Sequence, residues 1–317
     1  ESPAPPPVQP ASTGPADQTF ATGRDLQARG LFAEAEQAYI RALDHEPDNP
    51  QYHYYLGVAL HAQSQFDGAQ SHFERALAHK PDYAGPHIAL GKMLYDVHGD
   101  ADRARQLLSR AVELAPAATE ARYTLGLIHQ REGQLTKARE IFAAIAAADS
   151  GHIPARAQLG LVHLQLGDYQ HAEEELRSVC RLSPHDPAAF RNLGQALIRL
   201  GKPEEGQRQL TRAQVIDEQN TRLKPHQNAV RQYPNAPKAH SNLAAAYNRF
   251  GRLKLAFHHY MRSIRIDSTH GAGYQGLGNM YHRRGDATQA ARYYFEALRW
   301  DSTLAESHNN LGLIFHE

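Results

Sequence analysis

Residues 50–83 read PQYHYYLGVALHAQSQFDGAQSHFERALAHKPDY, and this 34-residue pattern decides the fold. We number the unit from 1, so that Gly57 of the Leu56–Gly57 pair is at position 8. His53 at position 4 and apolar or small residues at positions 7, 8 and 11 form one set, and small or apolar residues at positions 20, 24 and 27 form a second. Each set has the spacing of one face of an α-helix. Pro81, at position 32, stops a helix. The unit therefore predicts two helices joined by a turn.

The Leu-Gly pair recurs along the chain at intervals of 34 residues or a near multiple of it. The glycines of the pairs are Gly57, Gly91, Gly126, Gly160, Gly194, Gly278 and Gly312. Such self-similarity is typical of a repeat architecture, which has a long binding face rather than a pocket. Glycine also recurs at position 15, where its tolerance of the left-handed conformation would close the first helix. These turn glycines are Gly30, Gly133, Gly167, Gly201, Gly251 and Gly285.

With small residues at positions 8 and 20 and aromatic residues at 24, the unit resembles the tetratricopeptide repeat. The resemblance implies an all-α fold, a right-handed α-solenoid of tandem helix-turn-helix repeats. We expect residues 1–16 to be a Pro-rich disordered linker or tail and residues 17–220 to form repeats one to six. Residues 221–236 would be an inserted helical linker, and residues 237–317 repeats seven and eight with the first helix of a truncated ninth. The third repeat carries one extra residue near Gly99.

The insertion has two possible interpretations. We expect the second helix of repeat six to be extended, to break near Pro225 and to be followed by a short helix ending at Tyr233. The insertion would then be either a tolerated addition on the outer edge of the array, or a bend or partner contact.

Composition excludes several classes of protein. Lys and Arg total 34, as do Asp and Glu, so net charge favours neither nucleic acid nor an anionic membrane. The balance hides a gradient, because residues 187–317 hold 18 basic and 10 acidic residues. Cys180, as the single cysteine, excludes an internal disulfide. No apolar run predicts a membrane span. The start at Glu1, followed by Pro-rich sequence, suits either a chain after signal removal or one cut at that point.

The resemblance implies that the first helices line a concave groove through positions 2, 5, 6, 9, 12 and 13. A glycosyltransferase member of the family holds peptide backbone with an Asn ladder at position 6. Side-chain amides donate and accept hydrogen bonds, and Arg binds carboxylates, so the rear groove would be cationic. The alternatives are that Asn is simply common there, and that the Arg side chains are solvated or paired. The candidate peptide-binding residues are Arg191, Asn192, Arg199, Lys238, Asn242, Arg249, Asn279, Arg283 and Asn310.

No sequence motif indicates catalysis, a metal site or a cofactor. We interpret the histidines at positions 4 and 11, among them His53, His163 and His240, as packing residues too far apart to share an ion. We therefore expect no stabilisation by metals. Residues 173–175, three consecutive Glu, are interpreted as an exposed acidic run rather than a catalytic pair.

These patterns favour a non-enzymatic scaffold or adaptor that binds an extended peptide or a partner subunit along the concave face. One alternative is the recognition portion of a larger enzyme, such as a glycosyltransferase, with its catalytic domain beyond residue 317. Another is a periplasmic or lipid-anchored adaptor in envelope assembly. The expected partner is a protein or peptide, possibly acidic, with no nucleic acid and no direct membrane span. A periplasmic or secreted location is slightly favoured over the cytoplasm, and the oligomeric state stays open.

Overall fold

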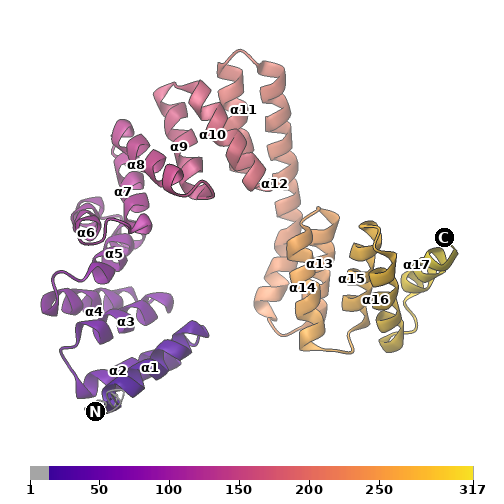
Figure 1. Ribbon diagram of the computed structural model, residues 1–317, viewed down its shortest axis with the longest axis horizontal. Helices are drawn as coiled ribbons and strands as arrows, with labels where there is room; N and C mark the ends of the chain where they lie inside the picture. Colours follow the sequence, from indigo (N-terminus) through magenta and orange to yellow (C-terminus); the bar gives the residue numbers. More distant parts are fainter. Residues whose placement is uncertain (1–13, 317) are drawn as a thin grey trace, which may run out of the picture. The chain divides into compact units, whose positions relative to one another are not determined.

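The computed structural model describes residues 14–316, in which α-helices follow one another in antiparallel pairs and no strand occurs (Figure 1). The predicted all-α solenoid is confirmed. Most of the predicted N-terminal linker lies outside the described residues. The first helix, however, begins at Pro15, and Ala16 is buried, so the helical array starts slightly earlier than the predicted boundary. None of the described helices is long and apolar enough to cross a membrane.

Each repeat contributes two helices. Repeats one to five comprise α1 (Pro15–Ala28), α2 (Phe32–His45), α3 (Pro50–Ala62), α4 (Phe66–His79), α5 (Ala84–Met93), α6 (Ala101–Leu114), α7 (Thr119–Arg131), α8 (Leu135–Ala148), α9 (Ile153–Leu166) and α10 (Tyr169–Leu182). The remaining helices are α11 (Pro187–Arg199), α12 (Pro203–Gln232), α13 (Pro237–Arg249), α14 (Leu253–Ile266), α15 (Gly271–Arg283), α16 (Ala287–Trp300) and α17 (Ala305–His316).

The described residues form two compact units. The first unit comprises residues 14–184 and 192–206, and the second comprises residues 185–191 and 207–316. Each unit has its own buried apolar clusters. The small residue at position 20 is completely buried in seven repeats, because the two helices of a repeat meet there. These residues are Ala35, Ala69, Ala104, Ala138, Ala172, Ala256 and Ala290.

The turns between paired helices use the predicted left-handed residue. The six turn glycines at position 15 have φ between 73° and 77°. Repeat two places Ser64 there instead, with φ 62°, and Ser64 is the one non-glycine residue with positive φ among the described residues. In repeat three a π-helical turn, Leu94–His98, accommodates the extra residue, and Gly99 follows it with φ 67°.

The predicted break near Pro225 is wrong, because α12 continues through Pro225 to Gln232. A proline inside a helix removes one backbone hydrogen bond and costs about 3 kcal/mol. Packing on both sides of Pro225 opposes that cost. Leu223 is completely buried against α13, and Val230 packs against the same apolar cluster. The insertion is therefore part of the core of the second unit, rather than an addition on its outer edge.

Candidate functional site

A hollow lined by both polar and apolar side chains lies between α12 and α13, within the second unit. Its volume is about 280 Å³. Asn242 and Arg249 line it from positions 6 and 13 of α13, as predicted for groove residues. Arg222 and His226 line it from the insertion, and no acidic residue is among its described lining. The hollow therefore combines a side-chain amide with two guanidinium groups, and its electrostatic character is positive.

The insertion is held in place by specific contacts with α13. Leu223 belongs to the same apolar cluster as Leu243 and Tyr247. The Gln227 side-chain amide donates a hydrogen bond of 3.1 Å to the Tyr247 hydroxyl. These contacts hold the turn of α12 that carries Arg222 and His226 against α13, which forms the other wall of the hollow.

Arg222 and His226 were not among the predicted site residues, although a partner contact was one interpretation of the insertion that carries them, because they lie outside the repeat register. The charge gradient of the chain already pointed to this half, but no repeat position identifies the two residues. Only the continuity of α12 brings them beside α13.

Two predicted groove residues, Asn279 at position 9 and the ladder residue Asn310 at position 6, are already engaged with each other. The Asn310 amide donates to the Asn279 carbonyl oxygen at 3.1 Å and to the Tyr294 hydroxyl at 3.0 Å. The Tyr294 hydroxyl donates to the Asn279 oxygen at 2.7 Å, and burial raises the pKa of Tyr294 to about 12. The Asn279 amide also donates to Glu306 at 3.0 Å. A peptide could use these amides only by displacing internal hydrogen bonds.

The predicted cationic residues divide into paired and unpaired groups. Arg191 forms an ion pair of 2.5 Å with Asp217 of α12. Arg283 donates a long hydrogen bond, 3.4 Å, to the side-chain oxygen of Asn248 on α13. Lys238 and Arg249 are exposed, and neither forms an ion pair with another described residue. Arg249 is therefore the predicted Arg best placed to receive a carboxylate in the hollow.

Asn192 and Arg199 belong to the first unit, whereas the other seven candidates belong to the second. Asn192 is half-buried and Arg199 is exposed on α11. We therefore describe the candidate site from the second unit alone.

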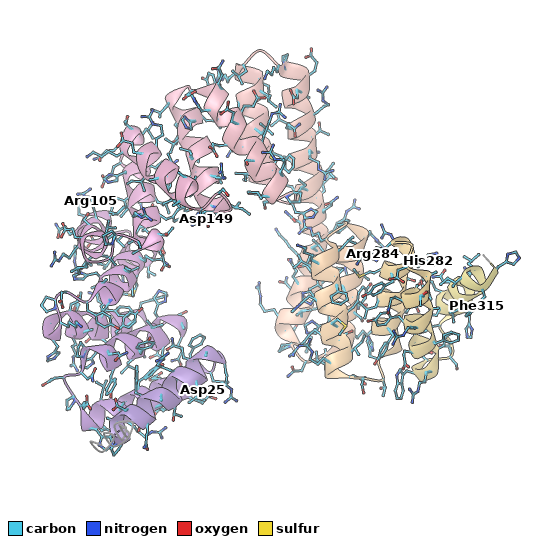
Figure 2. All side chains as sticks on the ribbon, viewed as in Figure 1. Asp25, Arg105, Asp149, His282, Arg284 and Phe315 are labelled. Carbon is cyan, nitrogen blue, oxygen red and sulfur yellow. The ribbon has the colours of Figure 1, made fainter. Side chains whose placement is uncertain are left out.

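The first unit has its own groove, whose residues were not predicted as site residues. A hollow of about 740 Å³ is lined by residues such as Tyr123, Leu127 and Asp149. A neighbouring hollow of about 300 Å³ shares Lys92, Asp96 and Glu120 with it. Figure 2 labels Asp149, which lies directly after α8. Most residues that line the two hollows occupy the predicted groove positions of α3, α5, the π-helical turn after α5, and α7. The list of groove positions could therefore have identified them from the sequence. The acidic side chains distinguish this groove from the hollow beside α13.

The histidines at position 4 share a hydrogen bond, and three of them, His53, His87 and His240, are also buried, as expected of packing residues. The Nε2 atom of each lies within hydrogen-bond distance of a backbone carbonyl six residues earlier. The four pairs are His53 with Pro47, His87 with Pro81, His240 with Pro234 and His308 with Ser302. Because a carbonyl only accepts, Nε2 carries the proton in each neutral ring. These histidines tie α3, α5, α13 and α17 to the loops that precede them.

Two expectations about polar residues need correction. His163 is not isolated from other metal-ligating groups, because His163, Asp168 and His171 place their ligand atoms within 4.8 Å of one another. Residues 173–175 are not a uniformly exposed run. Glu173 is mostly buried and pairs with Arg177 and Lys202, each at 2.8 Å, while Glu175 pairs with Arg156 at 2.6 Å. These carboxylates pair with cations of α9, of α10 itself and of the turn before α12.

The fold places this protein in the class of helical repeat arrays built from helix-turn-helix units. Comparison with known proteins identifies its family. Tetratricopeptide repeat families match residues 20–84, 98–162, 163–224 and 274–304. The chain therefore belongs to the tetratricopeptide repeat family. A search of curated proteins found no relative that matches this sequence.

Solved structures share the fold at low sequence identity. The type IV pilus biogenesis factor PilW has a TM-score of 0.55 and 16% identity, over 64% of this chain and 94% of its own. YrrB, described as a tetratricopeptide protein with an unusual peptide-binding site, has a TM-score of 0.53 and 18% identity, over 57% of this chain and 93% of its own. A tetratricopeptide repeat protein from Parabacteroides merdae has a TM-score of 0.50 and 15% identity, over 95% of this chain and 98% of its own. At such identities these similarities establish the fold.

Proposed function

We propose that this protein is a non-enzymatic interaction scaffold that binds an extended, acidic segment of a partner protein. The observation that carries the proposal is the hollow beside α13, where Asn242, Arg222 and Arg249 converge without an acidic neighbour in the lining. An amide can hold peptide backbone because it both donates and accepts hydrogen bonds. A guanidinium binds carboxylates through paired N–H groups. Together they favour an extended peptide that carries Asp or Glu.

The walls of the hollow support the same proposal. Ala245 and Ala246 are small, and Phe250 adds apolar surface at one end. Small residues allow a peptide backbone to approach the helix closely. Preorganised walls also reduce the entropy lost on binding, which favours affinity. YrrB, which shares the fold, is described as having a peptide-binding site, and this agrees with the same use of the fold here.

A peptide-binding measurement tests the proposal. Short fluorescent peptides rich in Glu would be compared with matched peptides in which Gln replaces each Glu, using fluorescence anisotropy. We expect the acidic peptides to bind more tightly, and Arg249→Glu to remove most of the difference. Arg265→Glu is the matched control, because Arg265 is exposed on α14 and does not line the hollow. Equal binding of both peptides, or equal effects of the two variants, would contradict the proposal.

A further inference from the structure

Two imidazoles and one carboxylate converge at the turn between α9 and α10, in the first unit. Gly167, with φ 77°, reverses the chain between the helices. This reversal brings His163 of α9 close to Asp168 and to His171 in the first turn of α10. The His163 Nδ1 lies 3.1 Å from Asp168 Oδ2, and the His171 Nδ1 lies 2.8 Å from the same oxygen. The imidazole rings stack with their centres 5.2 Å apart.

Helix capping alone does not account for this cluster. Asp168 is the N-cap of α10 and accepts a hydrogen bond of 3.4 Å from the His171 backbone N–H. Asp100 and Asp286 cap α6 and α16 in the same way, at 3.1 and 3.0 Å, without adjacent imidazoles. Two other histidine pairs, His53 with His72 and His240 with His259, place Nδ1 within hydrogen-bond distance of Nδ1. Only the cluster at Asp168 has a carboxylate between two imidazoles among these pairs.

The spacing suits a metal ion after a small adjustment. Bonds of about 2.0–2.2 Å from an ion to nitrogen and oxygen place neighbouring ligand atoms roughly 2.9–3.4 Å apart. The two distances to Asp168 Oδ2 already lie at or near that range. His171 can supply the adjustment, because 62% of its side chain is exposed, whereas only 11% of His163 is. His163 thus provides a fixed ligand and His171 an adaptable one.

The charged side chains around the cluster do not together disfavour the binding of a cation. Beyond the cluster itself, Glu174 of α10 and Arg139 of α8 act electrostatically on His171, and their charges are opposite. The ionised Asp168 adds one negative charge. Two imidazole nitrogens with one carboxylate oxygen are ligands preferred by zinc, nickel and cobalt rather than by calcium or magnesium.

We propose that His163, Asp168 and His171 form a binding site for one divalent transition-metal ion, with Zn²⁺ as the probe of choice. The three side chains would occupy one face of the ion, and solvent would occupy the open positions. The ion would join α9 to α10 across their turn, and so stabilise repeat five.

Calorimetric titration of the full chain with zinc chloride, after removal of any affinity tag, tests the site. We expect one equivalent to bind, and His171→Ala to weaken binding at least ten-fold. Because His171 is largely exposed, this variant should keep its helical circular dichroism. Asp168→Asn should also weaken binding at least ten-fold, while Asn still caps α10. His45→Ala is the control for the many surface histidines, since His45 is exposed on α2, and it should leave the affinity unchanged.

A second measurement separates a built site from scattered surface binding. Bound Co²⁺ should give a visible absorption spectrum that reports its ligands, and His171→Ala should change that spectrum whereas His45→Ala should not. Zinc should also raise the melting temperature of the wild type but not that of Asp168→Asn. Equal zinc affinity of the wild type and His171→Ala, or equal losses in His171→Ala and His45→Ala, would overturn the proposal.

Discussion

Gly126 of α7 lies directly against the ring of Phe142 on α8, with no space for a side chain between them. A Cβ atom added at Gly126 would lie 2.6 Å from Cε1 of that ring. The ring is completely buried, so it cannot move into solvent. This contact sets how closely the two helices of repeat four approach. It explains physically why the Leu-Gly pair recurs.

Gly126→Ala should therefore destabilise the protein by about 1–3 kcal/mol, since overpacking forces the ring or the helix to shift. Urea unfolding followed by circular dichroism at 222 nm, the standard helical signal, measures the change. Gly312→Ala is the matched control, because Gly312 occupies the same repeat position on α17 with nothing within 4 Å of its added Cβ. That control should be neutral or stabilising by up to about 1 kcal/mol. Similar losses in both variants would show that helix packing is not the cause.

Ser64 provides a test of the turn residue. Its φ of 62° lies in the left-handed region, which costs an L-residue about 1–2 kcal/mol and a glycine almost nothing. Glycine is also more flexible in the unfolded chain, which offsets part of the gain. Ser64→Gly should thus raise the free energy of unfolding by roughly 0.5–1 kcal/mol. Ser71→Gly, exposed inside α4, should lower it by a similar amount. A loss of stability in Ser64→Gly would contradict this view of the turn.

Much of this architecture was predictable from sequence, because local rules determine it. Helix positions follow from the two apolar stripes, and the turns follow from glycine at position 15. The continuous helix through Pro225 was not predictable in this way. Its stability depends on the burial of Leu223 against α13, which is a contact between segments rather than a local preference.

The candidate site was predictable only in part, for a similar reason. The repeat register predicts that Asn242 and Arg249 share one face of α13, and both line the same hollow. It could not show that Asn279 and Asn310 bind each other, or that Arg191 pairs with Asp217. Long polar side chains choose among several partners within reach, and that choice depends on rotamers and neighbouring helices. The position of a residue in the repeat determines where its Cα and Cβ atoms lie, but not where the polar end of a long side chain lies.

Two histidine pairs, His53 with His72 and His240 with His259, should make the stability of the protein depend on pH. Burial, followed by repulsion from His53 and His240 respectively, lowers the pKa of His72 and of His259 to about 4. In the unfolded chain both should titrate near 6.5. Between these values the unfolded state binds more protons, so stability falls as pH decreases from about 6.5 to about 4. Partial exposure reduces the effect to about 1–2 kcal/mol for each histidine.

Urea unfolding at several pH values, in the wild type and in His72→Gln, measures this contribution. The variant should lose less stability than the wild type between neutral pH and pH 5, because one proton-linked group is absent. His45→Gln removes an exposed histidine on α2 and should leave the pH dependence unchanged. If the pH dependence of His72→Gln equals that of the wild type, the His53–His72 pair is not the source.

The last prediction concerns the cationic face of the second unit. Arg249 lines the hollow beside α13, and Arg283 on α15 reaches Asn248 of α13. Changing both to Glu replaces attraction for an acidic peptide with repulsion. The double variant should bind more weakly by about 2–3 kcal/mol, roughly a hundred-fold, which would abolish measurable binding in a micromolar assay. Helical circular dichroism should stay intact, because both side chains are exposed.

Salt and charge controls distinguish a specific groove from general attraction. Wild-type affinity should fall with added salt, because exposed charges are screened within about 8–10 Å at physiological ionic strength. The double variant Arg265→Glu with Arg292→Glu changes net charge equally, on second helices that do not line the hollow. If this control loses as much affinity as Arg249→Glu with Arg283→Glu, then net charge rather than the hollow determines binding. If the groove variant keeps wild-type affinity for the acidic peptide at low salt, the peptide binds elsewhere on the protein, and the hollow beside α13 is not the site.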